Sequence, residues 1–143
     1  MKDLYGRTDS IFLRIYNSTK PIEDDANSIF TNSIEDVPVL VKKILEQKKI
    51  RKIIFLGAAF LSQSKLFITL SDDEIDSLMQ ANVMNYIKLT QSLLPFMLKL
   101  RGNIIYLSSF RANVTSRGIS LYAASKAFGE KFFEVIGKEY GAL

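Results

Sequence analysis

Hydrophobic and polar positions divide the chain into two kinds of segment, which predict strands and helices in turn. Two continuous apolar runs, Lys52–Ala59 (KIIFLGAA) and Asn103–Ser109 (NIIYLSS), are typical of parallel strands buried on both faces. Shorter runs at Ser10–Tyr16 and Ser28–Thr31 predict two further strands nearer the N-terminus.

Helical segments lie between these strands. Asp36–Gln47 reads as a helix. A longer helix is predicted from about Ser71 to Lys99, because Ser71 and Glu74 form an S-x-x-E capping box ahead of an apolar stripe. The last helix is expected to begin near Ser120 and to stop near Gly141.

Strands that alternate with helices predict an α/β fold, with a parallel sheet flanked by helices. We expect residues 1–143 to form a single domain of this kind. Ligands bind such sheets beyond the carboxyl ends of the strands. This rule directs attention to Leu56–Phe60 and Leu107–Phe110.

Composition excludes several kinds of chemistry. The 143-residue chain has no Cys and no His, so disulfides, thiolate catalysis, a Ser-His-Asp triad and the usual zinc sites are excluded. No apolar run approaches the roughly 20 residues of a membrane span, and a cytoplasmic location is expected. The net charge of +4 is scattered except around Lys42–Lys52, and no aromatic ladder accompanies it, so nucleic acid is not an expected partner.

The last predicted helix opens with SLYAASKAFGEKFF, in which Tyr122 and Lys126 stand four residues apart. That spacing makes the two side chains neighbours on one helical face. An ammonium beside a phenol lowers the pKa of the phenol and suits it to proton transfer. The pattern alone is weak, since Tyr16 and Lys20 repeat it at a turn, and a surface lysine beside a rim tyrosine would look the same.

Three further features support a functional reading. Ser108 and Ser109 end a predicted strand at the edge where ligands bind. Asn82 lies on the apolar stripe of the long helix, where an amide is costly unless it is hydrogen-bonded. Small residues, Gly57–Ala59, close another strand and would let a ligand approach the backbone.

Together these segments resemble the short-chain dehydrogenase/reductase family. The resemblance runs through LMQANVMNYIKLTQSLLPFM, GNIIYLSSFRA and LYAASKAF, and Ser109 stands thirteen residues before Tyr122, as in the family. It covers the chain well from about Ile53 to Gly141. The resemblance implies a Rossmann-like parallel sheet, a nicotinamide cofactor (NAD or NADP) and a small-molecule carbonyl or alcohol substrate.

The resemblance also implies residue roles. Tyr122 would be the general acid/base, and Lys126 would hold the cofactor ribose and lower the pKa of Tyr122. Ser109 would hold and polarise the substrate, and its hydroxyl is expected near that of Tyr122. Asn82 would anchor a water that connects Lys126 to solvent. The other residues implied to contact the cofactor are Gly57, Ala58 and Ala59; no metal is implied.

The chain departs from the family pattern near its N-terminus and at the end of the apolar run that begins at Lys52. None of its seven glycines forms the G-x-x-x-G-x-G turn that receives the cofactor pyrophosphate, and the first predicted strand resembles the family's second. The family's N-N-A-G is replaced by Gly57-Ala58-Ala59-Phe60. We therefore expect an incomplete Rossmann-like domain that binds cofactor weakly by itself.

Three functions remain open. The leading hypothesis is an NAD(P)-dependent oxidoreductase, and Asn82 with YAASKA favours that branch. A non-catalytic relative that serves as an interaction or oligomerisation module, and a sugar-nucleotide epimerase or dehydratase, are the alternatives. A homo-oligomer is expected through the two long helices, whose apolar side chains are more than one sheet face can cover: Leu89, Leu93, Phe96, Phe132 and Phe133.

Overall fold

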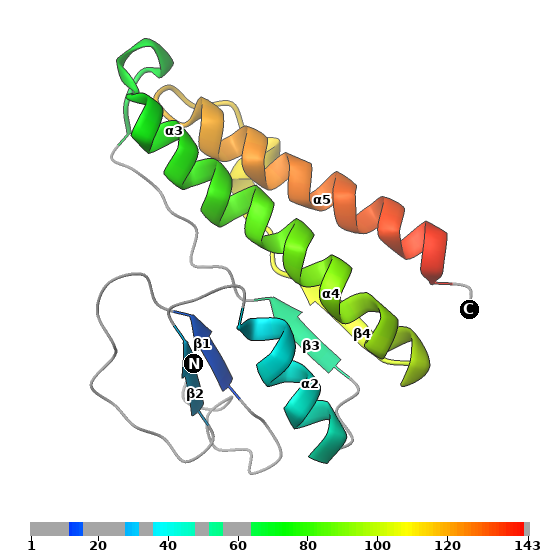
Figure 1. The fold of residues 1–143 in the computed structure, drawn as a ribbon. Coiled ribbons are helices and arrows are strands. Elements are labelled where there is room, and N and C mark those ends of the chain that lie inside the picture. The colour runs from blue at the N-terminus through cyan, green and yellow to red at the C-terminus, as the bar shows by residue number, and fades with distance from the viewer. Residues whose placement is uncertain (1–11, 16–27, 32–35, 48–51, 56–63, 142–143) are drawn as a thin grey trace.

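The computed structural model describes residues 12–15, 28–31, 36–47, 52–55 and 64–141. These residues form four short strands, and helices lie beside them (Figure 1). Three short turns complete the described elements: 3₁₀ turns at Phe67–Thr69 and Phe110–Asn113, and a π-helical turn at Gln80–Met84. The strands are β1 (Phe12–Ile15), β2 (Ser28–Thr31), β3 (Lys52–Phe55) and β4 (Asn103–Tyr106); the helices are α2 (Val37–Gln47), α3 (Asp72–Met79), α4 (Asn85–Lys99) and α5 (Ser120–Tyr140).

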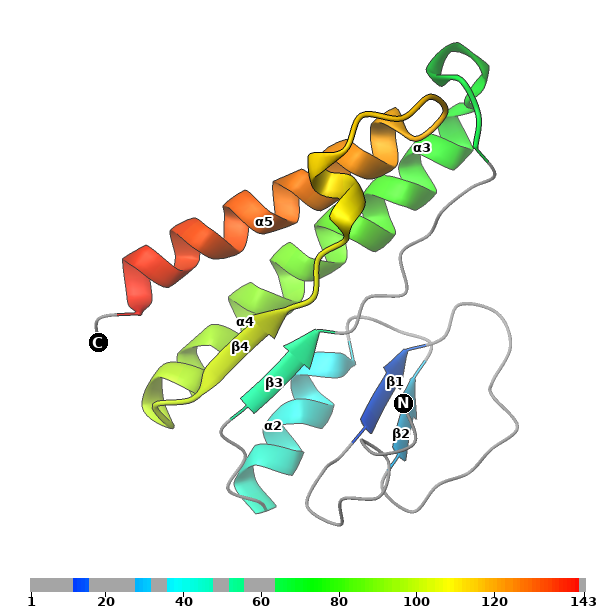
Figure 2. The ribbon, with the colours of Figure 1, turned by 180° about the vertical axis from the view of Figure 1, so that it is seen from behind.

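Every described strand pair is parallel, as the alternating pattern predicts. β1 pairs with β2, with Phe12 opposite Ser28, and β3 pairs with β4, with Lys52 opposite Asn103. Among the described residues these two ladders are separate, and no hydrogen bonds join β1 to β3. Figure 2 shows β3 lying between β4 and β1. A single continuous sheet is therefore not part of the described structure.

The helices bury an apolar core against β3 and β4. Val37 of α2 and Leu93 of α4 are 2% and 1% exposed, and Tyr86 and Leu89 belong to the same buried cluster. Ile53 and Ile104 pack against it from the two strands. Leu89 and Leu93 are thus internal residues, and the reasoning that counted them as surplus surface for self-association is wrong.

β4 is covered on one face only within the described part of the chain. Ile104 and Tyr106 point into the core, whereas Ile105 and Leu107 are 38% and 57% exposed. Side chains alternate across a strand, so this pattern assigns one face to the helices and leaves the other open. The expectation that Asn103–Ser109 is buried on both faces is wrong for this reason.

The long helix begins where the sequence predicts. Ser71 caps α3 by accepting the Glu74 backbone N–H at 3.3 Å, and the Ser71 N–H donates to the Glu74 carboxylate at 3.0 Å. The capping box is confirmed. The helix is interrupted by the π-helical turn, which the periodicity does not predict, before it continues as α4.

A matched pair of valines on α2 tests the core. Val37→Ala removes two buried methyl groups and should lower the free energy of unfolding by about 2 kcal/mol, at roughly 0.8 kcal/mol for each buried carbon plus a cavity contribution. Val39→Ala makes the same change at a side chain that is 69% exposed, and should alter it by less than about 0.5 kcal/mol. Equal losses in urea denaturation of the two variants would contradict this position of the core.

Candidate functional site

Three polar or charged side chains in the first turns of α5 are buried in the interior. Tyr122, Ser125 and Lys126 are 9%, 2% and 2% exposed. The Lys126 Nζ lies 6.0 Å from the centroid of the Tyr122 ring. The predicted sharing of one helical face is therefore confirmed, and Lys126 is an interior residue rather than a surface lysine.

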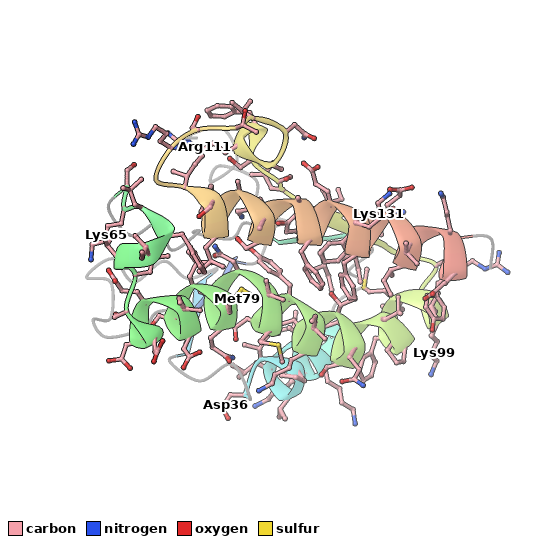
Figure 3. All side chains as sticks on the ribbon, turned by 90° about the horizontal axis from the view of Figure 1, so that it is seen from above. Asp36, Lys65, Met79, Lys99, Arg111 and Lys131 are labelled. Carbon is pink, nitrogen blue, oxygen red and sulfur yellow. The ribbon has the colours of Figure 1, made fainter. Side chains whose placement is uncertain are left out.

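Aromatic rings from three elements surround the Lys126 ammonium. Its Nζ lies 5.6 Å from the centroid of Tyr106 on β4 and 6.0 Å from that of Tyr86 on α4, in addition to Tyr122 on its own helix. A cation within about 6 Å of an aromatic centroid is attracted to the negative face of the ring. Within the described ranges, Lys126 forms no ion pair with a carboxylate. Side chains of α3, α4 and α5 fill the space between these helices (Figure 3).

The π-helical turn carries Asn82, which is 1% exposed. Its Nδ2 donates to the Ser125 Oγ at 3.1 Å, and that hydroxyl donates to the Tyr122 backbone carbonyl at 2.7 Å. The Asn82 Oδ1 is buried and has no hydrogen-bond partner within the described part of the protein. The amide is thus satisfied on one side only, and its free acceptor suits a water or ligand donor.

The two serines that follow β4 have different partners. The Ser108 Oγ donates to the Glu130 carboxylate of α5 at 2.7 Å. The Ser109 Oγ caps the next 3₁₀ turn by accepting the Arg111 backbone N–H at 3.3 Å. Ser109 is half-buried. The expected closeness of its hydroxyl to that of Tyr122 stays a prediction.

Tyr106 lies against α5 at Gly129, a contact that sequence reasoning missed. A Cβ on Gly129 would overlap the Tyr106 hydroxyl and stand 2.5 Å from its Cζ. The Tyr106 ring also stacks on Phe133 with centroids 4.8 Å apart and meets Tyr86 edge-on at 5.2 Å. A tyrosine in an otherwise aliphatic strand and a glycine inside a helix were the available signals, but the sequence does not say that they meet.

Burial changes the acidity of the core tyrosines. It raises the pKa of Tyr106 from 10.0 to about 12, with smaller contributions from Tyr86, Glu130 and Tyr122. The pKa of Tyr86 is also raised, chiefly by burial and then by Tyr122. The Tyr106 hydroxyl has no hydrogen-bond partner among the described residues. Both phenols therefore remain protonated well above neutral pH.

Gly57, Ala58 and Ala59, which the resemblance implies as cofactor contacts, lie outside the described residues. Self-association stays a prediction, although Phe128 and Val135 of α5 are 39% and 41% exposed.

Among the helices that the structure describes, none combines the length and the apolarity needed to cross a membrane.

The comparison with protein families decides the identity of the chain. A family model described as short chain dehydrogenase matches residues 26–142. The chain belongs to the short-chain dehydrogenase family. The resemblance drawn from its motifs is confirmed, and the family's Rossmann-like α/β fold agrees with the parallel strand pairs and their covering helices.

Solved structures of short-chain dehydrogenases share this fold. The chain is similar to one from Shigella flexneri, with 25% identity, a TM-score of 0.68 and coverage of 79% of this chain and 46% of that one. A structure from Escherichia coli CFT073, complexed with NADPH, has 25% identity and a TM-score of 0.68 over 79% of this chain and 49% of that one. A Saccharomyces cerevisiae short-chain dehydrogenase/reductase has 18% identity and a TM-score of 0.78, over 95% and 57%.

A curated relative from Mycosarcoma maydis is named very-long-chain 3-oxoacyl-CoA reductase. It is 30% identical over 74 residues, which are 51% of this chain and 21% of the relative. The chain thus spans about a fifth of this relative and about half of the similar solved structures.

Two glycine variants on α5 test the contact with Tyr106. Gly129→Ala should lower the free energy of unfolding by about 1–3 kcal/mol, because the added methyl group overlaps the Tyr106 ring. Gly137→Ala is the control: nothing lies within 4 Å of its added Cβ, and alanine favours a helix over glycine by about 0.5–1 kcal/mol. Chemical denaturation should therefore show a lower free energy of unfolding for Gly129→Ala and a higher one for Gly137→Ala. A Gly129→Ala variant more stable than the parent would contradict the contact with Tyr106.

The acidity of Tyr106 predicts how stability changes in alkali. The unfolded chain ionises this tyrosine near pH 10, whereas the folded protein keeps it protonated to about pH 12, so its contribution to stability is complete below pH 10 and is lost as the pH rises towards 12. Between pH 9 and pH 11.5, the free energy of unfolding should fall less in Tyr106→Phe than in the parent. Tyr140→Phe, at the 37% exposed tyrosine that ends α5, is the control and should match the parent. An unchanged loss in Tyr106→Phe would count against this burial.

Proposed function

We propose that the chain forms the catalytic part of an NAD(P)-dependent oxidoreductase, which interconverts a carbonyl compound and a secondary alcohol. The observation that carries the proposal is the buried group of Tyr122, Lys126 and Asn82, found in a chain that belongs to the short-chain dehydrogenase family. A lysine buried beside a tyrosine has no evident purpose in a core that apolar side chains could fill.

The residues present fit a nicotinamide cofactor. The Lys126 ammonium and the Tyr122 hydroxyl are polar groups of the kind that bind ribose hydroxyls, and the Asn82 Oδ1 is a buried acceptor without a described partner. When bound, the cofactor supplies the hydride. The structure from E. coli CFT073 that is complexed with NADPH supports this cofactor class, and the choice between NAD and NADP stays open.

In the proposed reduction, the Tyr122 hydroxyl gives its proton to the carbonyl oxygen while the carbonyl carbon receives the hydride. The product is an alcohol, and Tyr122 is left as a phenolate. The positive charge of Lys126 stabilises that negative charge, because the ammonium is held near the ring in an interior of low dielectric. Oxidation of the alcohol runs through the same groups in reverse.

Two neighbouring residues orient this pair. The Asn82–Ser125 hydrogen bond ties the π-helical turn to the first turns of α5, and the Ser125 hydroxyl fixes the carbonyl of Tyr122. We assign Ser109 to the substrate, whose carbonyl oxygen its hydroxyl would polarise. Gly57–Ala59, which follow β3 closely in the sequence, are assigned to the cofactor.

The substrate class is a ketone or the corresponding secondary alcohol. The relative named very-long-chain 3-oxoacyl-CoA reductase acts, by its name, on a ketone, and this supports carbonyl reduction. Its match covers 74 residues, so the acyl chain and the CoA group are not carried over to this protein.

Tyrosine and lysine variants test the proposal, each with a control on the same helix. Tyr122→Phe should lower ketone reduction by at least roughly 100-fold, because the proton donor is lost, while cofactor affinity changes less than about threefold. Tyr140→Phe, near the exposed end of α5, should leave ketone reduction and cofactor affinity unchanged.

Lys126→Ala should lower both cofactor affinity and turnover. Lys131→Ala, whose parent side chain is 72% exposed, should change neither.

Cofactor binding is measured by NADH and NADPH fluorescence, and turnover is measured on a panel of ketones. Weak binding by the 143-residue chain itself is expected, because none of its glycines forms the pyrophosphate turn. Full activity in Tyr122→Phe would refute the assigned role of Tyr122. No measurable turnover by the parent with any ketone would refute the activity for this chain.

A further inference from the structure

Lys126 carries its charge into a place lined by aromatic rings rather than by carboxylates. Three rings lie 5.6–6.0 Å from its Nζ, and they come from α4, β4 and α5. The nearest acidic residue along the same helix face is Glu130, four residues further on. Its carboxylate instead accepts hydrogen bonds from Ser108 at 2.7 Å and from Asn113 at 3.3 Å.

We propose that Tyr86 and Tyr106 are positioning residues, which hold the Lys126 ammonium by the faces of their rings, and that Gly129 fixes the place of Tyr106. The proposal rests on the function proposed above for Lys126. It adds the means by which the ammonium is kept in place: ring faces on two other elements of the fold.

At Tyr106 the geometry favours the ring over the hydroxyl group. The Tyr106 hydroxyl is buried and has no hydrogen-bond partner in the described part of the chain, so it does not hold Lys126 through a hydrogen bond. Its ring is fixed instead by stacking on Phe133 and by edge-on contact with Tyr86. These two contacts orient the ring whose face lies towards the ammonium.

Gly129 completes the arrangement because it gives the ring its room. A Cβ at this position would stand 2.5 Å from the Cζ of Tyr106 and 2.9 Å from its Cε1. No alanine fits there unless the ring moves. The ring would then leave the position in which it faces Lys126, although the lysine itself would be unchanged.

Acetylation of lysines by acetic anhydride, followed residue by residue with mass spectrometry, measures how firmly Lys126 is held. The internal reference is Lys99, an exposed residue of α4. In the parent and in Tyr106→Phe, which keeps the ring, we expect Lys126 to react at least about tenfold more slowly than Lys99. In Tyr106→Leu, which removes the ring, the Lys126 rate should rise at least about fivefold.

General loosening of the fold is controlled in two ways. Met97→Ala removes a side chain that is 2% exposed and does not belong to the core cluster of Tyr86, Tyr106 and Phe133, so it should destabilise the protein without moving those rings. Its Lys126 rate should stay at the parent value. The double variant Gly129→Ala/Tyr106→Leu restores the space but not the ring, and its Lys126 should react as fast as in Tyr106→Leu.

The outcomes separate the possibilities. A Lys126 rate in Tyr106→Leu equal to that in the parent, or a Met97→Ala rate as high as in Tyr106→Leu, would overturn the proposal. If Tyr106→Leu does not fold, Gly129→Ala serves in its place, and parent-like protection there would overturn it too. The readout needs neither cofactor nor turnover. Failure of the proposed oxidoreductase activity would leave the acetylation result as it stands.

Discussion

The burial of one positive charge is the constraint on which the centre of this structure depends. Removing an ammonium from water costs several kcal/mol, and Lys126 has no carboxylate partner among the described residues to offset that cost. Each ring face at about 6 Å returns roughly 0.5–2 kcal/mol. Three rings can therefore offset much of the penalty, but only if every element that carries one keeps its place relative to α5.

Several local irregularities become understandable in this light. The π-helical turn widens the long helix where Asn82 reaches Ser125, and such turns are frequent at functional sites. Gly129 weakens α5 by helix propensity but lets β4 approach with a full tyrosine. Both features lower local stability, and both bring a side chain to the neighbourhood of Lys126. The π-helical turn and Gly129 thus reduce the stability of their helices but help to keep the Lys126 ammonium in one place.

The sequence predicted the elements well because their signals are local. Spacing of apolar residues placed β2 and α2 to within a residue, and the S-x-x-E pattern placed the start of α3. The pairing of Tyr122 with Lys126 followed from the geometry of a single helix. Contacts between distant segments have no such signal, which is why Tyr106 against Gly129 was missed. The open face of β4 was missed because an apolar run does not say which neighbours are present.

The contact between Tyr106 and Gly129 couples the evolution of two positions that lie 23 residues apart in the chain. Neither residue can be substituted freely by itself. A larger residue at position 129 is tolerated only if a smaller one has already replaced Tyr106. Such pairs show strong non-additivity, and the order of substitution decides which intermediates fold. Related proteins are expected to carry a bulky side chain at one of the two positions and a small one at the other. The pair would therefore appear in an alignment as coupled variation rather than as two conserved residues.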